Sequence, residues 1–323
     1  MTDLSPLQPI VATLSGPRAS ALKWQEGVVS LVLDVSGLSV AERGALEADL
    51  KAQLGAIEGV NDVRVVMTAE RKDMRIIAVA SGKGGVGKST ISANLAIALA
   101  RRGVKVGLVD ADIYGPSQPR LLASEGVKPD ARDNKMIPVR NGYGVPMLSM
   151  GQLVAPGQAI AWRGPMAGNA LAQLIDAHWS DFGIDTLIID MPPGTGDIQL
   201  SMVQKHKPKG AVIVSTPQDL ALIDATRAIH LFEQANVPVI GIIENMAGYI
   251  CPHCGETSDP FGKGGAEATA ASLGVPFLGR IPLALDIREC SDAGDPPAAG
   301  TDPVAEPFHA LAGRLADWLA TPH

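Results

Sequence analysis

A glycine-rich segment set between an apolar run and a helical run constrains this 323-residue chain most strongly. Residues 75–80 have strand character, the segment after them fits the pattern G-x-x-x-x-G-K-[ST], and residues 88–102 have helical character. In this context the glycines let consecutive backbone N–H groups surround phosphate oxygens, and the helix N-terminus adds a partial positive charge. The alternative is a glycine-rich turn that binds nothing. The pattern predicts a phosphate-binding loop made of Gly82, Lys83, Gly84, Gly85, Val86, Gly87, Lys88, Ser89 and Thr90.

Two lysines of this loop have different expected roles. Lys88 is expected to reach the β- and γ-phosphates of a nucleotide, and the Ser89 hydroxyl to help hold Mg²⁺. Lys83 is not needed by a generic phosphate-binding loop. It is either a solvated loop charge or a catalytic cation that neutralises phosphate charge, supplied from a partner subunit as an arginine finger is.

Short apolar runs alternate with helical segments from residue 75 onward. This order predicts an α/β domain with a mostly parallel sheet, buried on both faces and flanked by helices. Aromatic residues are only 4% of the chain, so Ala, Val, Ile and Leu must fill its core. The predicted strands are residues 75–80, 104–110, 185–190, 210–215, 237–244 and 275–281; the predicted helices are residues 88–102, 165–176, 220–235, 265–273 and 303–319.

Acidic residues stand where two of these strands end, on the side where such sheets bind ligands. Asp112 is a catalytic candidate that orients the attacking water or accepts its proton, and Asp110 is a candidate to brace the Mg²⁺ ligands or Lys88. Both are alternatively turn-capping aspartates. Asp190 closes an apolar strand, which predicts a carboxylate near Mg²⁺, and residues 191–197 after it form a candidate γ-phosphate sensor. The alternative is a turn beside an ordinary buried aspartate.

Asn245 follows another predicted strand. Its amide both donates and accepts hydrogen bonds, which suits the edge of a purine base. Asn is also a routine turn residue. No Asn-Lys-x-Asp segment typical of guanine recognition is evident, so ATP is favoured by default.

Cys251 and Cys254 form a C-x-x-C pair, which places two thiolates at one metal ion or cluster edge. The chain has no second such pair, and Cys290 is isolated. The pair is therefore half of a site. A symmetric dimer would supply the four thiolates of a 4Fe-4S cluster. The rival is zinc, because the segment also resembles one knuckle of a zinc ribbon and His253 is a further candidate ligand.

Composition and charge narrow the classes of partner. The formal net charge of −7 argues against non-specific binding to nucleic acid or anionic lipid. Three cysteines cannot build a disulfide framework and indicate a reducing compartment. No run approaches the roughly 18 apolar residues of a membrane span, and the first residues lack the charged start of a signal peptide. A cytoplasmic protein without membrane or nucleic-acid partners is expected.

Residues 1–72 are expected to form a separate small α+β domain. Residues 4–14 and 39–54 have helical character, residues 27–35 and 60–67 have strand character, and the polar residues 68–73 suit a linker. This segment contains no Cys, no His and no glycine-rich loop. It predicts no chemistry of its own.

Four segments together, GKGGVGKST, DADIYGPS, DMPPGTGD and NMAGYICPHCG, resemble those of the Mrp/ApbC family of iron-sulfur cluster carrier ATPases. That family belongs to the deviant-Walker-A group of P-loop NTPases, with MinD, ParA and the nitrogenase iron protein. The match runs from about residue 73 to 290. Residues 1–72 are similar in position and size to the MIP18-like (DUF59) domain, but lack its Asp-Pro-Glu segment and its cysteine.

The resemblance implies a homodimeric ATPase over residues 73–323 that uses ATP and Mg²⁺. Such a protein carries a labile 4Fe-4S cluster between subunits and passes it to apo iron-sulfur proteins. Lys83 matches the family's signature lysine, Asp112 and Asp190 match its switch aspartates, and Cys251 and Cys254 match its cluster ligands.

Two other functions stay open at this point. A positioning ATPase of the ParA/MinD kind would share the phosphate loop, but the C-x-x-C pair and the acidic net charge argue against it. A zinc-bearing metal-handling NTPase would keep the cysteine pair and exchange the cluster for zinc.

Overall fold

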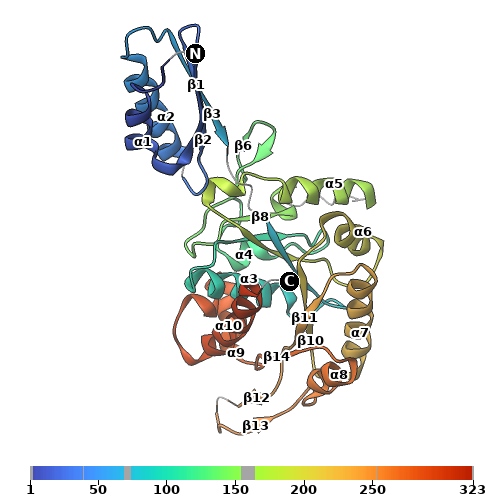
Figure 1. Ribbon diagram of the computed structural model, residues 1–323. Helices are drawn as coiled ribbons and strands as arrows, with labels where there is room; N and C mark the ends of the chain where they lie inside the picture. Colours follow the sequence, from blue (N-terminus) through green and yellow to red (C-terminus); the bar gives the residue numbers. More distant parts are fainter. Residues whose placement is uncertain (1–2, 39, 69–73, 154–163, 252, 322–323) are drawn as a thin grey trace. The chain divides into compact units, whose positions relative to one another are not determined.

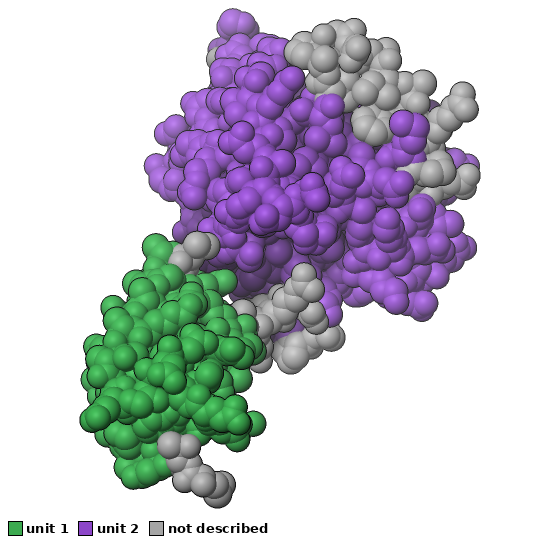
Figure 2. All heavy atoms as spheres, turned by 90° about the horizontal axis from the view of Figure 1, so that it is seen from above, with its two compact units in different colours: residues 1–73 green, residues 74–323 purple. Residues whose placement is uncertain are grey.

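The computed structural model describes residues 3–38, 40–68, 74–153, 164–251 and 253–321. The chain divides into two compact units, Met1–Asp73 and Met74–His323, which Figure 2 colours separately. Residues 69–73 of the expected linker lie outside the described residues. Within the described part, no helix is both long enough and apolar enough to cross a membrane.

The first unit has a small sheet with two helices on one side of it (Figure 1). Its elements are α1 (Gln8–Ser15), β1 (Ala19–Gln25), β2 (Val28–Asp34), α2 (Val40–Gly55) and β3 (Asp62–Thr68). Strand β2 lies in the middle, antiparallel to β1 and parallel to β3. Val29, Leu31 and Leu33 alternate along β2 and are buried with Leu50 of α2. The two predicted strands and both helices are present; β1 was missed because its sequence has no regular apolar alternation.

The second unit is built on a seven-stranded sheet of order β14-β11-β10-β4-β9-β5-β8. Every neighbouring pair is parallel. The prediction of a mostly parallel sheet is therefore confirmed. The strands are β4 (Arg75–Ala80), β5 (Val106–Asp110), β8 (Met147–Ser149), β9 (Thr186–Asp190), β10 (Gly210–Ser215), β11 (Val239–Glu244) and β14 (Phe277–Arg280). Only β8 was not predicted, because three residues are too few for a periodic signal.

Helices cover both faces of this sheet (Figure 1). Alternate residues of β4 enter different cores: Ile76 and Ala78 pack on one face, and Ile77 and Val79 on the other. The first face contacts α5 (Gly164–Ile175), α6 (Asp197–His206), α7 (Asp219–Gln234) and α8 (Gly265–Leu273); the second contacts α3 (Lys88–Arg101), α4 (Gln118–Leu121) and α10 (Glu306–Ala320). Strands whose side chains are buried on both faces need such a double cover.

The remaining elements are short. Two hairpins are formed by β6 (Ala131–Arg132) with β7 (Lys135–Met136), and by β12 (Tyr249–Ile250) with β13 (Thr257–Ser258). Helices α6 and α9 (Leu285–Ala293) were not predicted. The helix expected at residues 303–319 begins with a 3-10 turn, Pro303–Ala305, before α10.

Candidate nucleotide site and cysteine hairpin

The predicted phosphate loop connects the end of β4 to the start of α3. Gly85 and Gly87 have φ of +79° and +81°, a backbone conformation that L side chains rarely adopt. Helix α3 begins at Lys88, so its first N–H groups lie at the end of the loop. The structure thus gathers all nine predicted loop residues, Gly82 through Thr90, into one strand–loop–helix connection.

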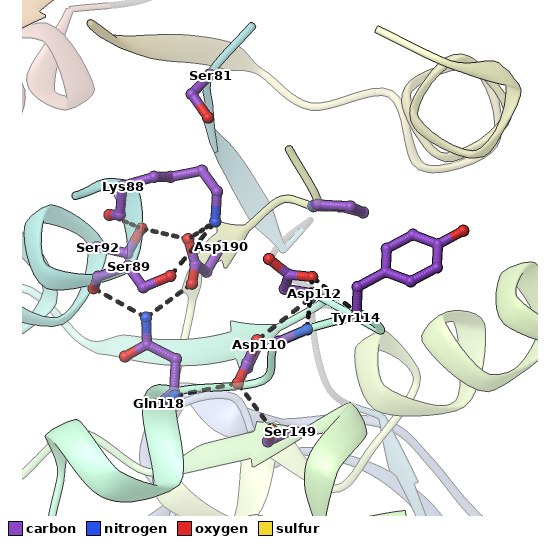
Figure 3. A network of polar contacts seen from close by, with 12 residues as sticks. Ser81, Lys88, Ser89, Ser92, Asp110, Asp112, Tyr114, Gln118, Ser149 and Asp190 are labelled. Atoms are coloured by element: carbon purple, nitrogen blue, oxygen red, sulfur yellow. Dashed lines mark hydrogen bonds and ion pairs between the residues drawn. The ribbon is translucent and has the colours of Figure 1, made fainter. Parts of the chain in front are cut away.

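Asp190 and Lys88 meet in the interior (Figure 3). Lys88 Nζ lies 2.5 Å from Asp190 Oδ1, and the two side chains are 6% and 0% exposed. Ser92 Oγ also donates to Asp190 Oδ1, at 2.9 Å. The Gln118 side-chain amide donates to Asp190 Oδ2, at 2.9 Å. The carboxylate at the end of β9 is therefore held by donors from both α3 and α4.

Asp110 lies opposite Asp190 in the register between β5 and β9 and is fully buried. Its Oδ2 accepts hydrogen bonds from Ser149 Oγ at 2.9 Å and from the Gln118 backbone N–H at 3.1 Å. Burial, and next the charge of Asp190, raise the pKa of Asp110 to about 7. Two carboxylates beside one ammonium leave this site negative when both are ionised.

Oxygen donors and an excess of negative charge are what Mg²⁺ prefers. The Ser89 hydroxyl lies 3.5 Å from Lys88 Nζ, beside the Asp190 carboxylate. The donor set of Ser89 and Asp190 therefore fits the magnesium ion that the sequence predicts, and both residues are within reach of the phosphate loop.

Asp112 follows β5 in a turn. Its Oδ1 accepts the backbone N–H group of Tyr114 at 3.1 Å (Figure 3) and that of Gly115 at 3.2 Å. This is the geometry of a turn-capping aspartate, which was the alternative to a catalytic role for Asp112. The side chain is 8% exposed and lies in the same network as Asp110, whose Oδ1 accepts the Asp112 backbone N–H. A catalytic role for Asp112 stays a prediction.

The loop after β9 is hydrogen-bonded to Ser81, the residue just before the phosphate loop. The Gly194 N–H donates to the Ser81 carbonyl at 3.0 Å, and the Gln199 side-chain amide donates to the Pro192 carbonyl. The predicted segment 191–197 thus begins beside the strand end that leads into the phosphate loop. The sensing role itself stays a prediction.

Lys83 is only partly exposed, and its Nζ lies 3.4 Å from Gln218 Oε1, next to the start of α7. Its action on a partner subunit's nucleotide stays a prediction.

Asn245 is 7% exposed and donates its side-chain amide to the Val86 carbonyl of the phosphate loop, at 2.8 Å. The expected partner was a purine edge, whereas the structure gives this donor a backbone partner. Recognition of the base by Asn245 stays a prediction.

The cysteine pair lies at the tip of the β12–β13 hairpin. The Cys251 N–H donates to the Glu256 carbonyl and the Gly255 N–H to the Cys251 carbonyl, both at 2.9 Å. Hydrogen bonds from the Cys254 and His253 backbone N–H groups, and then from the Cys254 thiol, lower the pKa of Cys251. Backbone donors that stabilise a thiolate also favour its binding to a metal ion. Position 252 lies outside the described residues.

The hairpin carries two thiols, with His253 between them in the sequence. Cys251 is partly exposed and Cys254 is exposed. Across the described parts of the chain, no group of three or more His, Cys, Asp and Glu side chains is arranged to hold a metal ion. Cys290 belongs to α9, where burial, followed by nearby acidic side chains, raises the pKa of its thiol.

Three polar residues of the nucleotide site were not predicted: Ser92, Gln118 and Ser149. Ser92 was detectable, because it lies one helical turn after Lys88 and so shares its face of α3. Gln118 and Ser149 reach the site through α4 and β8, which have no periodic pattern in the sequence.

A parallel sheet with a glycine-rich phosphate loop at its carboxyl edge, and acidic residues at the neighbouring strand ends, defines a P-loop nucleotide-binding protein. The family model ParA, described as NUBPL iron-transfer P-loop NTPase, matches residues 73–316. The chain belongs to this family. The resemblance to iron-sulfur cluster carriers is therefore confirmed.

Individual relatives agree with the family. The iron-sulfur cluster carrier protein of Pseudomonas fragi is 50% identical over 241 residues, which cover 73% of this chain and 83% of that protein. A nucleotide-binding protein from Archaeoglobus fulgidus, solved in complex with ADP, is 40% identical, with a TM-score of 0.62 over 73% of this chain and 91% of that one.

A cell-division ATPase MinD from Pyrococcus furiosus is 24% identical, with a TM-score of 0.55 over 76% of this chain and 99% of that one. This likeness shows the fold alone. Because the family model and the close relatives concern iron transfer and iron-sulfur clusters, the positioning ATPase and the zinc-bearing NTPase are not favoured.

Proposed function

We propose that this protein binds and hydrolyses ATP and carries a labile 4Fe-4S cluster, which it holds between two copies of the chain and passes to apo iron-sulfur proteins. The observation that carries this proposal is the accessible hairpin with Cys251 and Cys254, on the same chain as a complete phosphate loop. The expected cytoplasmic location, and the absence of membrane and nucleic-acid partners, stay predictions.

The nucleotide half of the proposal uses groups already close together. Backbone N–H groups of the loop and the Lys88 ammonium bind the phosphates, for which Lys88 turns away from Asp190. Ser89 and Asp190 hold Mg²⁺, which when bound neutralises charge on the phosphates. Asp112 orients the attacking water. The ADP bound to the Archaeoglobus fulgidus relative supports this assignment.

The cluster half of the proposal follows from ligand number. A 4Fe-4S cluster takes four thiolates, and one hairpin provides two. A second copy related by two-fold symmetry provides the same two residues again. Transfer then exchanges these four thiolates for four from the acceptor, with no net oxidation or reduction. The cluster is thus cargo, bound through accessible groups that a recipient can reach.

Anaerobic reconstitution with iron and sulfide tests the proposal on one sample, through iron content, absorbance and molecular mass. We expect about four iron atoms for every two chains, and a dimeric mass, in the unmodified protein. Cys251→Ser is expected to lose the cluster and keep ADP binding. Lys88→Ala is expected to weaken ADP binding about tenfold or more, because it removes a charged phosphate contact, and to keep the thiols.

Cys290→Ser is the matched control, since this thiol belongs to α9 and not to the hairpin. It is expected to keep both the cluster and the nucleotide. Stoichiometric zinc without iron in the unmodified protein contradicts the carrier function. Cluster transfer by the Cys251→Ser protein contradicts the ligand assignment.

A further inference from the structure

Gln118 is hydrogen-bonded to three parts of the nucleotide site: the end of β5, the end of β9 and the start of α3. It belongs to none of the segments that the sequence predicts to bind phosphate or Mg²⁺. It is the first residue of the short helix α4 and is completely buried. Its side-chain Nε2 donates to the Ser89 carbonyl and to Asp190 Oδ2, both at 2.9 Å, and its backbone N–H donates to Asp110 Oδ2 at 3.1 Å. Figure 3 shows this amide between the start of α3 and the Asp190 carboxylate.

The two oxygens of Asp190 are held in different ways. Oδ1 accepts from the Lys88 ammonium and from Ser92, whereas Oδ2 accepts from the neutral Gln118 amide. When Lys88 turns to the phosphates, Oδ1 loses its charged partner, and the bond from Gln118 still fixes the carboxylate. An amide orients the carboxylate without neutralising it, so its negative charge stays available to a cation.

The other end of the same side chain argues against a role in packing alone. Gln118 Oε1 is buried and has no hydrogen-bond partner among the described residues. Burying an amide oxygen without a donor is unfavourable, and an apolar side chain of similar size avoids that cost. The presence of an amide at this position is therefore explained by the hydrogen bonds that its nitrogen donates to Ser89 and Asp190.

Resting on the proposed ATP hydrolysis, we propose that Gln118 is a positioning residue for the Mg²⁺-dependent step. Its side chain orients Asp190 and the backbone of Ser89, and its own backbone fixes Asp110. The loop of residues 111–117, which includes Asp112, is thereby held next to Ser89 and Asp190, the proposed Mg²⁺ ligands. Gln118 acts through these groups and does not itself contact the reacting atoms.

The test compares Gln118→Leu with Gln152→Leu in the full-length protein. Gln152 is also buried and also has an unpartnered amide atom, but its side chain accepts from the Ser149 N–H and has no bond to Asp190. Two quantities are measured: steady-state ATP hydrolysis, and the affinity for ADP with and without Mg²⁺. The second requires no turnover.

Hydrogen bonds to a charged group support an effect of about tenfold or more. We expect Gln118→Leu to lower kcat by about that factor and to lose most of the gain in ADP affinity that Mg²⁺ provides. Its ADP affinity without Mg²⁺ should match that of the unmodified protein. Gln152→Leu should change neither kcat nor the Mg²⁺-dependent gain by more than about threefold.

Gln118→Met tests the same bond with an unbranched side chain of similar length, in case the leucine variant does not fold. It removes the amide donor to Asp190 and keeps the backbone N–H that donates to Asp110. We therefore expect this variant to lose the Mg²⁺-dependent gain in ADP affinity as Gln118→Leu does.

The outcomes separate this inference from the proposed function. An unmodified protein without ATP hydrolysis overturns the proposed function. If the unmodified protein hydrolyses ATP, an unchanged Mg²⁺-dependent gain in Gln118→Leu overturns the role of Gln118, as does an unchanged gain in Gln118→Met.

Discussion

At the scale of single residues, the main electrostatic feature is a pair of buried carboxylates, Asp110 at the end of β5 and Asp190 at the end of β9. The ammonium of Lys88, at the start of α3, contacts the second of them. Asp110 and Asp190 are both fully buried and lie in register, and only Asp190 is paired with Lys88. One of the two negative charges is thus unpaired in the interior, which is unfavourable in low dielectric. This is why the pKa of Asp110 is raised to about 7, first by burial and then by Asp190.

This shift predicts how stability depends on pH. Below the ordinary pKa of 3.8, Asp110 is protonated in both the folded and unfolded states. Between that value and about 7 the folded state keeps a proton that the unfolded chain has lost, so this residue's contribution to the free energy of unfolding falls as pH rises. Asp110→Asn cannot ionise. The stability advantage of the unmodified protein over Asp110→Asn should therefore decrease by about 2–3 kcal/mol from pH 5 to pH 8.

Urea unfolding of both proteins at several pH values measures this difference. Other titrating groups are common to the two proteins and cancel in the comparison. Stability curves that run parallel from pH 5 to pH 8 would show that Asp110 does not carry the shift.

The sequence predicted single residues of the site where a local pattern names them. Lys88 and Ser89 belong to a spaced motif, and Asp190 closes an apolar strand, so their meeting at the sheet edge was predictable. The hydrogen bonds of Gln118 and Ser149 were not predictable, because these residues belong to α4 and β8. Both elements are too short to show a pattern in the sequence. Neither did the sequence indicate that the Asn245 amide donates to Val86.

At the scale of elements, the phosphate loop is packed closely against α7. A Cβ added at Gly82 would lie 2.0 Å from the Asp224 carbonyl oxygen and 2.1 Å from its carbonyl carbon. Both atoms belong to the helix backbone and cannot move without moving α7. The first glycine of the motif is therefore required by helix packing as well as by the path of the loop.

Gly82→Ala is accordingly expected to lower the free energy of unfolding by about 1–3 kcal/mol and to weaken nucleotide binding by displacing the loop. Gly84→Ala is the matched control in the same loop, because its nearest neighbour would be Pro193 at 3.9 Å. Thermal unfolding and ADP titration of the two variants measure the contrast. Equal stability of Gly82→Ala and the unmodified protein would mean that α7 can shift to make room for the added methyl group at little cost in free energy.

The same scale shows which elements the sequence could predict. Each of the six predicted strands of the large sheet is present, within two residues at each end, because buried parallel strands have continuous apolar runs. Strand β8 and helix α4 were missed, as they have only three and four residues. Helix α9 was missed because its sequence, LDIRECSDA, is largely polar.

At the scale of the whole molecule, the two units have separate hydrophobic cores. Leu7, Leu31, Leu33 and Leu50 belong to the core of the first unit, and the two cores of the second unit lie on either side of its sheet. The family match begins at residue 73, one residue before the second unit starts. A MIP18-like identity for residues 1–72 stays a prediction.

Every candidate site residue, from Gly82 to Cys254, lies in the second unit. A unit with its own core and its own complete site is expected to fold and act alone. We therefore predict that a fragment of residues 74–323 binds ADP and hydrolyses ATP within about twofold of the full-length protein, and takes up a cluster in the same ratio per chain. Calorimetric titration, ATP turnover and anaerobic reconstitution measure these properties, and the Lys88→Ala version of the fragment controls for contaminating ATPases. A fragment that shows a cooperative unfolding transition but binds no ADP would mean that the first unit takes part in the nucleotide site.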